Sequence, residues 1–315
     1  MNGLTLAIPS KGRLKDQCEA FLSACGFSLR QAGGDRGYRA VLSGLEGVDV
    51  LLLSASEIAR GLIEGAFQIG VTGEDLLHEY AGAFDRELAV IKPLGFGRAD
   101  AVVAVPQSWL DVSTMADLEA AGALFRARHG RRMRVATKYL RLTRAFFASR
   151  SVGEYRLIES AGATEAAPAS GAAELIVDIT STGSTLKANA LKVLDDGVIL
   201  KSQAALTGSL KADWTEDALG ALRLLLDRIE ARAAGDSKRV LFATKPIPAD
   251  TASALDLELA DDRRRASVAA DHAADAAARL AGEGFGPVNV LSQEFLFQAS
   301  NPVFEHFLGS LRQSP

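Results

Sequence analysis

The residues best suited to chemistry lie in the stretch LIVDITSTGSTLKAN, at positions 175–189. An apolar run is followed by a patch of hydroxyl side chains around Gly183, and then by residues that favour a helix. A strand, a tight turn and a helix start together present several backbone N–H groups, which attract an anion. The hydroxyls of Thr182, Ser184 and Thr185 add donors, and a glycine allows the backbone to approach a phosphate closely. The stretch therefore predicts a phosphate-binding loop.

Asp178 ends the apolar run and would repel a bound phosphate, so it is expected to face another part of the ligand. Ribose hydroxyls, or a Mg²⁺ ion that they help to hold, both suit a carboxylate. The ligand implied is a ribose 5-phosphate unit. ATP hydrolysis by a P-loop is not supported, because the spacing of that motif is absent. The alternative is that the hydroxyls only cap a helix, which Thr182 or Ser184 could do unaided.

Strand-like and helix-like segments alternate around this loop and would position it. Apolar runs of strand length lie at 4–9, 48–54, 68–73, 99–106, 132–139 and 174–179. Helical patterns lie at 14–26, 56–66, 140–150, 183–194 and 214–235. This alternation is typical of α/β architecture with largely parallel sheets.

Glycine and proline near residues 93–97 predict a crossover between two lobes, with a return near residue 206. GDSK at 235–238 predicts a linker. The expected domains are lobe I at 1–95 plus 207–236, lobe II with the loop at 96–206, and a small C-terminal β/α appendage at 238–315. In the appendage, a strand is expected at 240–246, an Ala-rich helix at 263–284 and one or two strands at 288–298.

Composition narrows the class of protein. The 315 residues carry a formal net charge of −4, so general nucleic-acid binding, which needs a basic face, is not expected. Cys18 and Cys25 are the only cysteines and are interpreted as core residues, since a zinc site needs more ligands. Two thiols and an N-terminus without a signal-peptide pattern predict a cytoplasmic protein. No apolar run reaches the ~20 residues needed to cross a bilayer, so no membrane partner is expected.

The loop and the residues before it resemble the signature of the ATP phosphoribosyltransferase family. That signature is a glutamate, a glycine, an apolar strand ending in aspartate, and a Thr-Gly-x-Thr-Leu turn. The matching residues are Glu165, Gly171, Asp178, Thr182, Gly183, Thr185 and Leu186. Other family-like segments follow in order: IPSKGRL at 8–14, GVTGEDLL at 70–77, ATKY at 136–139 and LKANAL at 186–191. The resemblance covers about residues 4–235.

The resemblance implies a fold and an activity. Family members have two α/β lobes arranged like a periplasmic binding protein, with the site in the cleft. They transfer the phosphoribosyl group of phosphoribosyl pyrophosphate to N1 of ATP and release pyrophosphate, in the first step of histidine biosynthesis. Mg²⁺ is the implied cofactor. Because N1 already has a free lone pair, the reaction needs no strong base, and none of the four histidines lies in a signature segment.

The resemblance also implies roles for individual residues. Asp178 and the loop as far as Thr185 would hold the ribose and its 5-phosphate, and Asp178 would meet Mg²⁺ through the Mg²⁺–substrate complex. Glu165 would belong to the same substrate site. Lys11 and Arg13 would face the pyrophosphate or triphosphate, and together with Asp178 they are the expected catalytic residues.

Further substrate-binding residues are expected along the cleft. By the resemblance, Glu74 and Asp75 would lie at its edge, near the ribose or metal. Lys138 and Tyr139 end a strand, where ligands sit in open α/β sheets. Arg98 follows the crossover and is expected either to bind phosphates or to be a solvated charge, and the same two interpretations apply to the basic run at 126–134.

Two other functions remain open at the level of sequence. One is a two-lobed small-molecule binding protein without catalysis, although the phosphate loop argues against it. The other is a nucleobase-salvage phosphoribosyltransferase, but those chains usually carry two adjacent acids where this chain has Asp178 and Ile179.

The family resemblance also frames the question of partners. Long members of the family end in a domain that senses histidine as an inhibitor. Short members work with a separate regulatory subunit resembling histidyl-tRNA synthetase. This chain is long but lacks the Ser-Pro-Thr segment expected in the sensor domain. We expect a homo-oligomer whose appendage senses histidine, with dependence on a regulatory subunit as the alternative.

Overall fold

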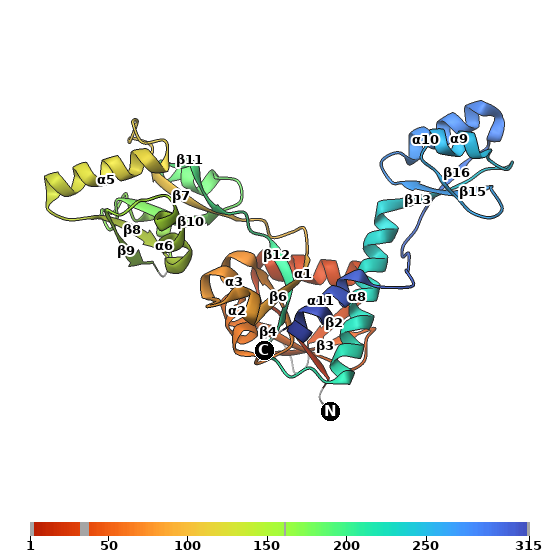
Figure 1. Ribbon diagram of the computed structural model, residues 1–315, viewed down its shortest axis with the longest axis horizontal. Helices are drawn as coiled ribbons and strands as arrows, with labels where there is room; N and C mark the ends of the chain where they lie inside the picture. Colours follow the sequence, from red (N-terminus) through yellow and green to blue (C-terminus); the bar gives the residue numbers. More distant parts are fainter. Residues whose placement is uncertain (1–2, 32–37, 161, 314–315) are drawn as a thin grey trace.

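Two α/β lobes and a small appendage make up the computed structural model, which describes residues 3–31, 38–160 and 162–313 (Figure 1). Each part has its own sheet and its own hydrophobic core. This arrangement confirms the expected α/β class with two lobes and a C-terminal appendage.

Lobe I is built on a seven-stranded sheet in the order β2-β3-β4-β1-β5-β12-β6. The strands are β1 (Leu4–Pro9), β2 (Ser28–Gln31), β3 (Arg39–Ser43), β4 (Val48–Leu53), β5 (Ile69–Gly73), β6 (Leu88–Pro93) and β12 (Ala204–Ser209). The helices are α1 (Gly12–Ala24), α2 (Ala55–Glu64), α3 (Glu74–Tyr80), α4 (Phe84–Glu87), α8 (Glu216–Ser237) and α11 (Pro302–Gln313). Strand β1 is parallel to β4 and β5, while β12 runs antiparallel to β5 and β6.

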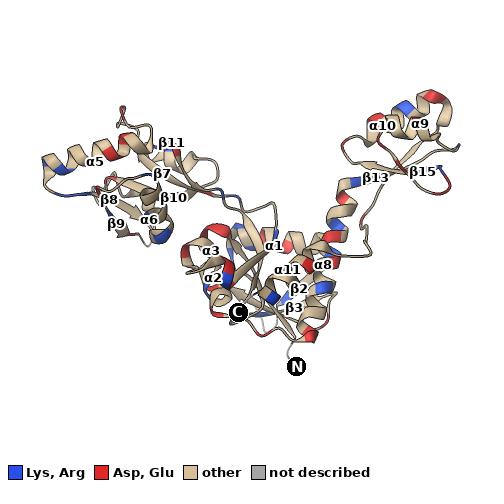
Figure 2. Ribbon diagram, viewed as in Figure 1, with Lys and Arg blue, Asp and Glu red and all other residues tan. Residues whose placement is uncertain are grey.

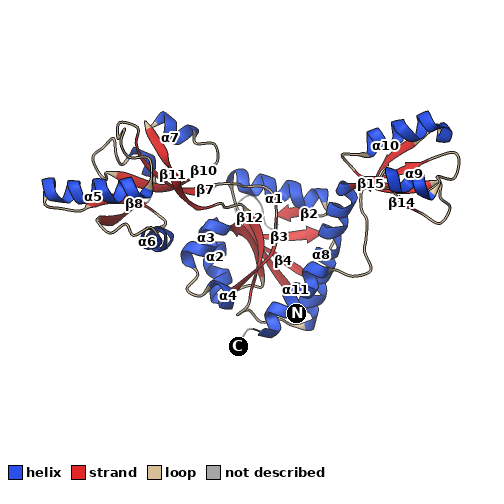
Figure 3. Cartoon of the chain, turned by 45° about the horizontal axis from the view of Figure 1, so that its top comes forward, coloured by secondary structure: helices blue, strands red, loops and turns tan. Residues whose placement is uncertain are grey.

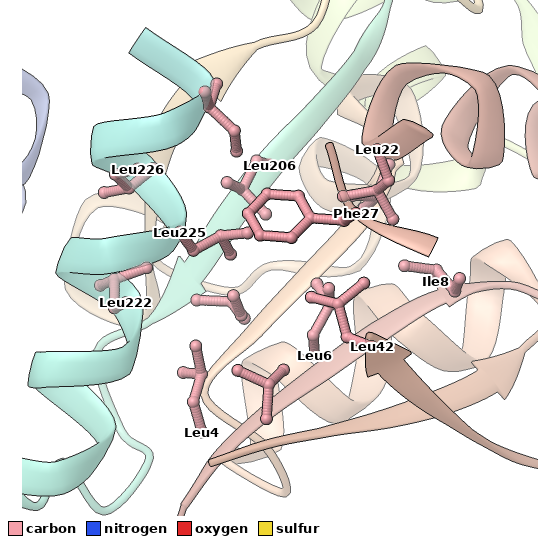
Figure 4. Close-up of a cluster of buried hydrophobic side chains, with 14 of the residues drawn as sticks. Leu4, Leu6, Ile8, Leu22, Phe27, Leu42, Leu206, Leu222, Leu225 and Leu226 are labelled. Carbon is pink, nitrogen blue, oxygen red and sulfur yellow. The ribbon is translucent and has the colours of Figure 1, made fainter. Parts of the chain in front are cut away.

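Alternating residues of β1 bury both faces of this sheet, because successive side chains of a strand point to opposite sides. Leu4, Leu6 and Ile8 belong to one core cluster with residues of α1, α8 and α11. Figure 4 shows them together with Leu22 of α1 and with Leu222, Leu225 and Leu226 of α8. Ala7 packs on the other face with α2 and α3. Helices therefore cover the sheet on both sides, as Figure 3 shows.

Lobe II has a five-stranded sheet in the order β11-β7-β10-β8-β9. Its elements are β7 (Asp100–Pro106), α5 (Met115–His129), β8 (Met133–Thr137), α6 (Leu140–Ser149), β9 (Tyr155–Glu159), a 3-10 turn at Thr164–Ala166, β10 (Leu175–Thr180), α7 (Ser184–Ala188) and β11 (Leu191–Leu200). Strand β10 lies between β8, to which it is parallel, and β7, to which it is antiparallel. Helix α7 has only five residues, so the helix expected at 183–194 is wrong beyond Ala188.

Two crossover segments, 94–99 and 201–203, connect the lobes and hydrogen-bond to each other. The N–H of Ala99 donates to the carbonyl of Ser202 at 2.9 Å, and the N–H of Ala204 donates to that of Phe96 at 2.9 Å. The return into lobe I occurs at β12, which begins at Ala204, slightly earlier than the sequence predicted. The two crossovers thus form one paired ribbon.

The appendage has an antiparallel sheet in the order β14-β15-β13-β16, with helices on one face. Its elements are β13 (Lys238–Phe242), α9 (Ala249–Ala254), β14 (Glu258–Leu259), β15 (Arg265–Ala269), α10 (Ala273–Leu280), a π-helical turn at Ala281–Phe285 and β16 (Asn289–Ser292). The Ala-rich helix expected at 263–284 is wrong in its first part, because Arg265–Ala269 pairs with β13 as a strand.

The expected linker at 235–238 is also wrong, because α8 continues through Gly235 and β13 begins directly after it. A side chain at Gly235 would meet the carbonyl oxygens of Gln293 and Glu294 at 2.9 Å. The glycine therefore permits close approach of the returning chain and does not interrupt the helix.

That returning chain ends in α11, which packs on lobe I and not in the appendage. Phe304 and Phe307 are buried in the lobe I core. A side chain at Gly208 of β12 would lie 2.4 Å from the Phe307 ring, so the glycine makes room for it. The appendage is consequently an insertion of about residues 238–300 between two elements of lobe I.

No helix in the part of the chain that the structure describes is long and apolar enough to span a membrane. In the view of Figure 2, basic and acidic residues are mixed over both lobes and the appendage.

Candidate functional site

The predicted phosphate loop follows β10 and is a short, mostly exposed turn. Gly183 adopts φ +73°, the left-handed region that favours glycine. Its N–H bonds the hydroxyl of Thr180 at 2.9 Å, while the hydroxyls of Thr182 and Ser184 lie 2.9 Å apart. No atom outside the immediate chain lies within 4 Å of where a Gly183 side chain would project. The loop therefore offers hydroxyls and backbone beside open space, although the shortness of α7 limits any helix-dipole contribution.

Asp178 lies at the carboxyl-terminal end of β10, as the sequence predicted. Its carboxylate accepts a hydrogen bond from the N–H of Ile179 at 2.8 Å. Burial raises the pKa of Asp178, and the nearby Glu165 raises it further, whereas the Ile179 hydrogen bond and Lys138 oppose the shift. A half-buried carboxylate under this penalty gains from a cation or from hydroxyl donors.

A cavity of about 220 Å³ brings the loop together with lobe I. Its lining includes Arg13 of α1 and Ala99 of the crossover, facing Glu165 and the segment 178–186 of lobe II. The structure thus places together the predicted residues Arg13, Glu165, Asp178, Thr182, Ser184 and Thr185. A guanidinium, two carboxylates and several hydroxyls around one space suit a phosphorylated sugar.

A second cavity of about 360 Å³ adjoins the first, since Ala99, Thr180 and Ser181 line both. It contains Arg98 and Lys201, one from each crossover, which could neutralise phosphates. Sequence reasoning missed Lys201. A sequence signal for Lys201 exists, because it is a basic residue in the segment that the sequence predicts as the return between the lobes.

Lys11 and Lys138 are exposed at the edges of this region. Lys11 precedes α1, and its charge lowers the pKa of Glu57, after the larger effects of hydrogen bonds from Ser54. The Lys138 ammonium lies 5.0 Å from the centre of the Tyr139 ring. Both side chains remain free to reach a ligand, but neither lines the two cavities.

Asp75 and Tyr139 occupy a different position from the one expected. Both are buried, at 6% and 0% exposure, and neither lines either cavity. The Tyr139 hydroxyl donates to Asp75 at 2.5 Å, and Ser202 donates to the same carboxylate at 2.9 Å. Direct substrate contact by this pair is not what the geometry supports. Glu74, next in the chain, is half-buried, and burial raises its pKa.

Four of the five arginines in the basic run at 126–134 form ion pairs within lobe II. Arg126 and Arg132 pair with Glu154, while Arg131 and Arg134 pair with Glu174. Although burial raises the pKa of Glu174, hydrogen bonds from the two arginines bring it to about 2. A role as phosphate ligands is therefore not supported for these four arginines, and the fifth, Arg128, lines neither of the two cavities.

The metal-binding capacity of the site is limited. Among the described residues, no group of three or more His, Cys, Asp or Glu side chains could hold a metal ion. Two carboxylates, Glu165 and Asp178, line the smaller cavity. This donor set fits Mg²⁺, which is commonly held by one or two carboxylates and by substrate phosphates. Cys18 and Cys25 are buried free thiols in the lobe I core, as predicted.

Comparison with known proteins points to one family. The model of the ATP phosphoribosyltransferase family (HisG) matches residues 54–231. An ATP phosphoribosyltransferase of Caulobacter vibrioides is 52% identical over 313 residues, covering 98% of each chain. One of Rhodopseudomonas palustris is 46% identical over an alignment of 325 positions, also covering 98% of each.

Among solved structures, the ATP phosphoribosyl transferase (HisG:HisZ) complex from Thermotoga maritima is similar, with a TM-score of 0.54 and 25% identity. The match covers 72% of this chain and 98% of that chain.

Proposed function

Because this chain belongs to the ATP phosphoribosyltransferase family, we propose that the cavity between Arg13 and the loop 178–186 is the place of phosphoribosyl transfer. The chain is a pentosyltransferase of the first step of histidine biosynthesis, so the resemblance found in the sequence is confirmed. Membership of this family excludes the two alternative functions, a non-catalytic binding protein and a nucleobase-salvage enzyme. Family members use a metal ion. The observation that carries the proposed site is that one cavity joins a lobe I guanidinium to the lobe II loop.

The 5-phosphate of phosphoribosyl pyrophosphate binds the hydroxyls and backbone around Gly183. Asp178 faces the ribose hydroxyls, because among the described residues only the Ile179 N–H donates a hydrogen bond to its half-buried carboxylate. Arg13 faces the pyrophosphate, with Lys11 at the same edge. In the larger cavity, Arg98 and Lys201 hold the phosphates of ATP. Glu74 lies at the lobe boundary and borders the ribose of ATP.

Transfer forms a bond between adenine N1 and C1 of the ribose and breaks the bond from C1 to the pyrophosphate oxygen. Positive charge develops on the sugar, and negative charge develops on the leaving group. Arg13 and Lys11 stabilise the pyrophosphate, while Asp178 and the loop fix the ribose. No residue has to remove a proton from N1, which agrees with a cavity lined by no histidine.

We propose Mg²⁺ as the metal and Asp178 as the protein group nearest to it. When bound, Mg²⁺ neutralises the pyrophosphate charge. Calorimetry should show that phosphoribosyl pyrophosphate binding is strengthened by Mg²⁺ in the wild type and much less so in Asp178→Asn. Equal Mg²⁺ dependence in the two proteins would contradict the assignment.

Arg13→Ala tests the proposed site against a matched control, Lys15→Ala. Lys15 is on the same helix but pairs with Glu19 and does not line the cavity. We expect the rate of phosphoribosyl-ATP formation, measured by chromatography, to be about 100-fold lower in Arg13→Ala. This is the scale of one lost charge-stabilising contact. Lys15→Ala should retain activity within about two-fold. Equal activity of the two variants would move the site elsewhere.

For the appendage we propose a role as a built-in histidine sensor in a homo-oligomer. The appendage has its own core and lies outside residues 54–231, which the family model matches, and this supports an added function. The purified chain alone should be active and inhibited by millimolar histidine, with its mass measured by light scattering. Weak, histidine-insensitive activity that a HisZ-like subunit rescues would instead assign the chain to the partner-dependent kind.

A further inference from the structure

Buried polar groups beside the crossovers connect the two lobes. Asp75, in the first turn of α3, accepts the Tyr139 hydroxyl from lobe II at 2.5 Å. Ser202 of the crossover donates to the other carboxylate oxygen at 2.9 Å and accepts the Asp75 N–H at 3.0 Å. One carboxylate thus joins lobe I, lobe II and the crossover between them.

Glu79, one helical turn further along α3, makes a second connection. Helix α6 begins after Tyr139, which provides no side-chain cap of its own. The Glu79 carboxylate accepts hydrogen bonds from the N–H of Arg141, at 3.0 and 3.1 Å, and of Leu142, at 3.0 Å. A lobe I side chain therefore caps a lobe II helix, in the way that a capping residue satisfies free N–H groups. Arg141 returns the contact by donating to the carbonyl of Gly82 at 2.8 Å.

Gly73 shows that the position of the Asp75 carboxylate constrains the sequence around it. A Cβ at Gly73 would lie 2.2 Å from Asp75 Oδ1. The backbone at Gly73 has φ −73° and ψ 139°, which any residue adopts, so the missing side chain matters only for this space. Gly73→Ala would displace the carboxylate without changing Asp75 itself.

The contact also connects to the proposed site. Tyr139 follows Lys138 at the end of β8, and Thr137 pairs with Val177 in β10. This register places Lys138 beside Asp178, in agreement with the influence of Lys138 on the Asp178 carboxylate. Whatever holds Tyr139 against lobe I therefore holds Lys138 and Asp178 at a defined distance from Arg13.

We propose that Asp75, Glu79 and Tyr139 form a pivot between the lobes. They are positioning residues that keep the lobe II loop aligned with Arg13 during transfer. The inference rests on the proposed function of the cavity. It assigns Asp75 and Tyr139 to the alignment of the lobes and not to substrate contact.

The test combines a distance and a kinetic measurement on the full chain. Spin labels are attached at Glu64→Cys in lobe I and Ala148→Cys in lobe II, which are exposed positions, whereas the native Cys18 and Cys25 are buried. Tyr139→Phe removes only the hydroxyl. Tyr155→Phe is the matched control, because its hydroxyl has no hydrogen bond to any residue that the structure describes and its ring packs within lobe II.

We expect Tyr139→Phe and Gly73→Ala each to broaden the interlobe distance distribution and to lower kcat about ten-fold, the scale of losing one charged hydrogen bond. The Kd for phosphoribosyl pyrophosphate, measured without ATP, should change less than kcat does, because the loop that holds the ribose and its 5-phosphate remains intact. The double variant should be no worse than either single variant, since both act on the same bond. Tyr155→Phe should match the wild type.

Wild-type distances and kcat in Tyr139→Phe would overturn the pivot. If Tyr139→Phe does not fold, Gly73→Ala decides, since its backbone is unstrained. Failure of the proposed function would look different: the wild type itself would form no phosphoribosyl-ATP, while the distance measurement would still report on the pivot.

Discussion

Two polar clusters lie where the lobes meet, and both combine a carboxylate with hydroxyl side chains. In the pivot, Asp75 is satisfied by Tyr139 and Ser202 and is 6% exposed. In the loop, the hydroxyls of Thr182 and Ser184 are exposed and contact mainly each other. The same residue types therefore serve opposite purposes. In the pivot, the polar groups hydrogen-bond to one another, and the cluster fixes the position of the lobes. In the loop, the polar groups lie beside a cavity, and a ligand supplies their hydrogen-bond partners.

The loop side of this comparison is tested most strongly by Gly183→Val. A side chain there would occupy the proposed phosphate space and strain the left-handed backbone. We expect calorimetry to detect no phosphoribosyl pyrophosphate binding, with the fold retained. Gly130→Val is the matched control, because Gly130 also lies in lobe II with φ +66° and open space but caps α5 away from both cavities. Unchanged affinity in Gly183→Val would show that the loop does not hold the phosphate.

Asp178→Asn tests the charge of the loop acid while keeping its shape. We expect turnover to fall at least ~100-fold, the scale of one key electrostatic contact. Near wild-type turnover would transfer the role to Glu165, because Asp75 is occupied in the pivot.

The two clusters should also respond differently in stability. Ser202→Ala removes one of the two side-chain donors to the buried Asp75 carboxylate, leaving the Tyr139 hydroxyl, and should lower the free energy of unfolding by about 1–3 kcal/mol. Ser184→Ala removes an exposed hydroxyl and should change it by no more than about 0.5 kcal/mol, while weakening phosphoribosyl pyrophosphate binding. Denaturant titration of both variants measures this difference in the free energy of unfolding. A larger stability loss in Ser184→Ala would reverse the comparison.

The smallest effect expected is a dependence of stability on pH at Asp178. Burial raises its pKa above the ordinary value of 3.8, so the folded protein binds this proton more tightly than the unfolded chain does. The resulting stabilisation is present below that value and is lost as pH rises through the higher folded pKa. Asp178→Asn should therefore have a higher Tm than the free wild type at pH 7, and the difference should shrink toward pH 4. A lower Tm at pH 7 would contradict the burial penalty.

Sequence reasoning located the loop but not the pivot, and the reason is distance along the chain. The loop residues are consecutive, so hydroxyls, glycine and acid could be recognised together. Asp75 is separated from Tyr139 by 64 positions and from Ser202 by 127. Nothing in the local pattern indicates that these side chains meet, and Asp75 and Tyr139 were consequently predicted to bind substrate.

The same limit explains where the predicted fold was wrong. Strands such as β1 and β10 are buried on both faces and read as apolar runs. Arg265–Ala269 has helix-forming neighbours, and only pairing with β13 makes it a strand. Gly235 resembles a helix stop, but it accommodates a backbone segment almost 60 positions later. Tertiary contacts decide these cases.

The return of α11 to lobe I has a consequence for how the chain folds. The core of this lobe combines β1, near residue 4, with Phe304 and Phe307, so the first and last elements of the described chain must meet. During synthesis lobe II and the appendage, each continuous in sequence, can fold as they emerge, whereas lobe I stays incomplete until the final helix leaves the ribosome. Contacts of such high sequence separation slow folding, because the loop-closure entropy is lost before they form. A nascent chain would thus carry a folded lobe II and a folded appendage on an incomplete lobe I. The chain is most prone to aggregate while lobe I is in this incomplete state.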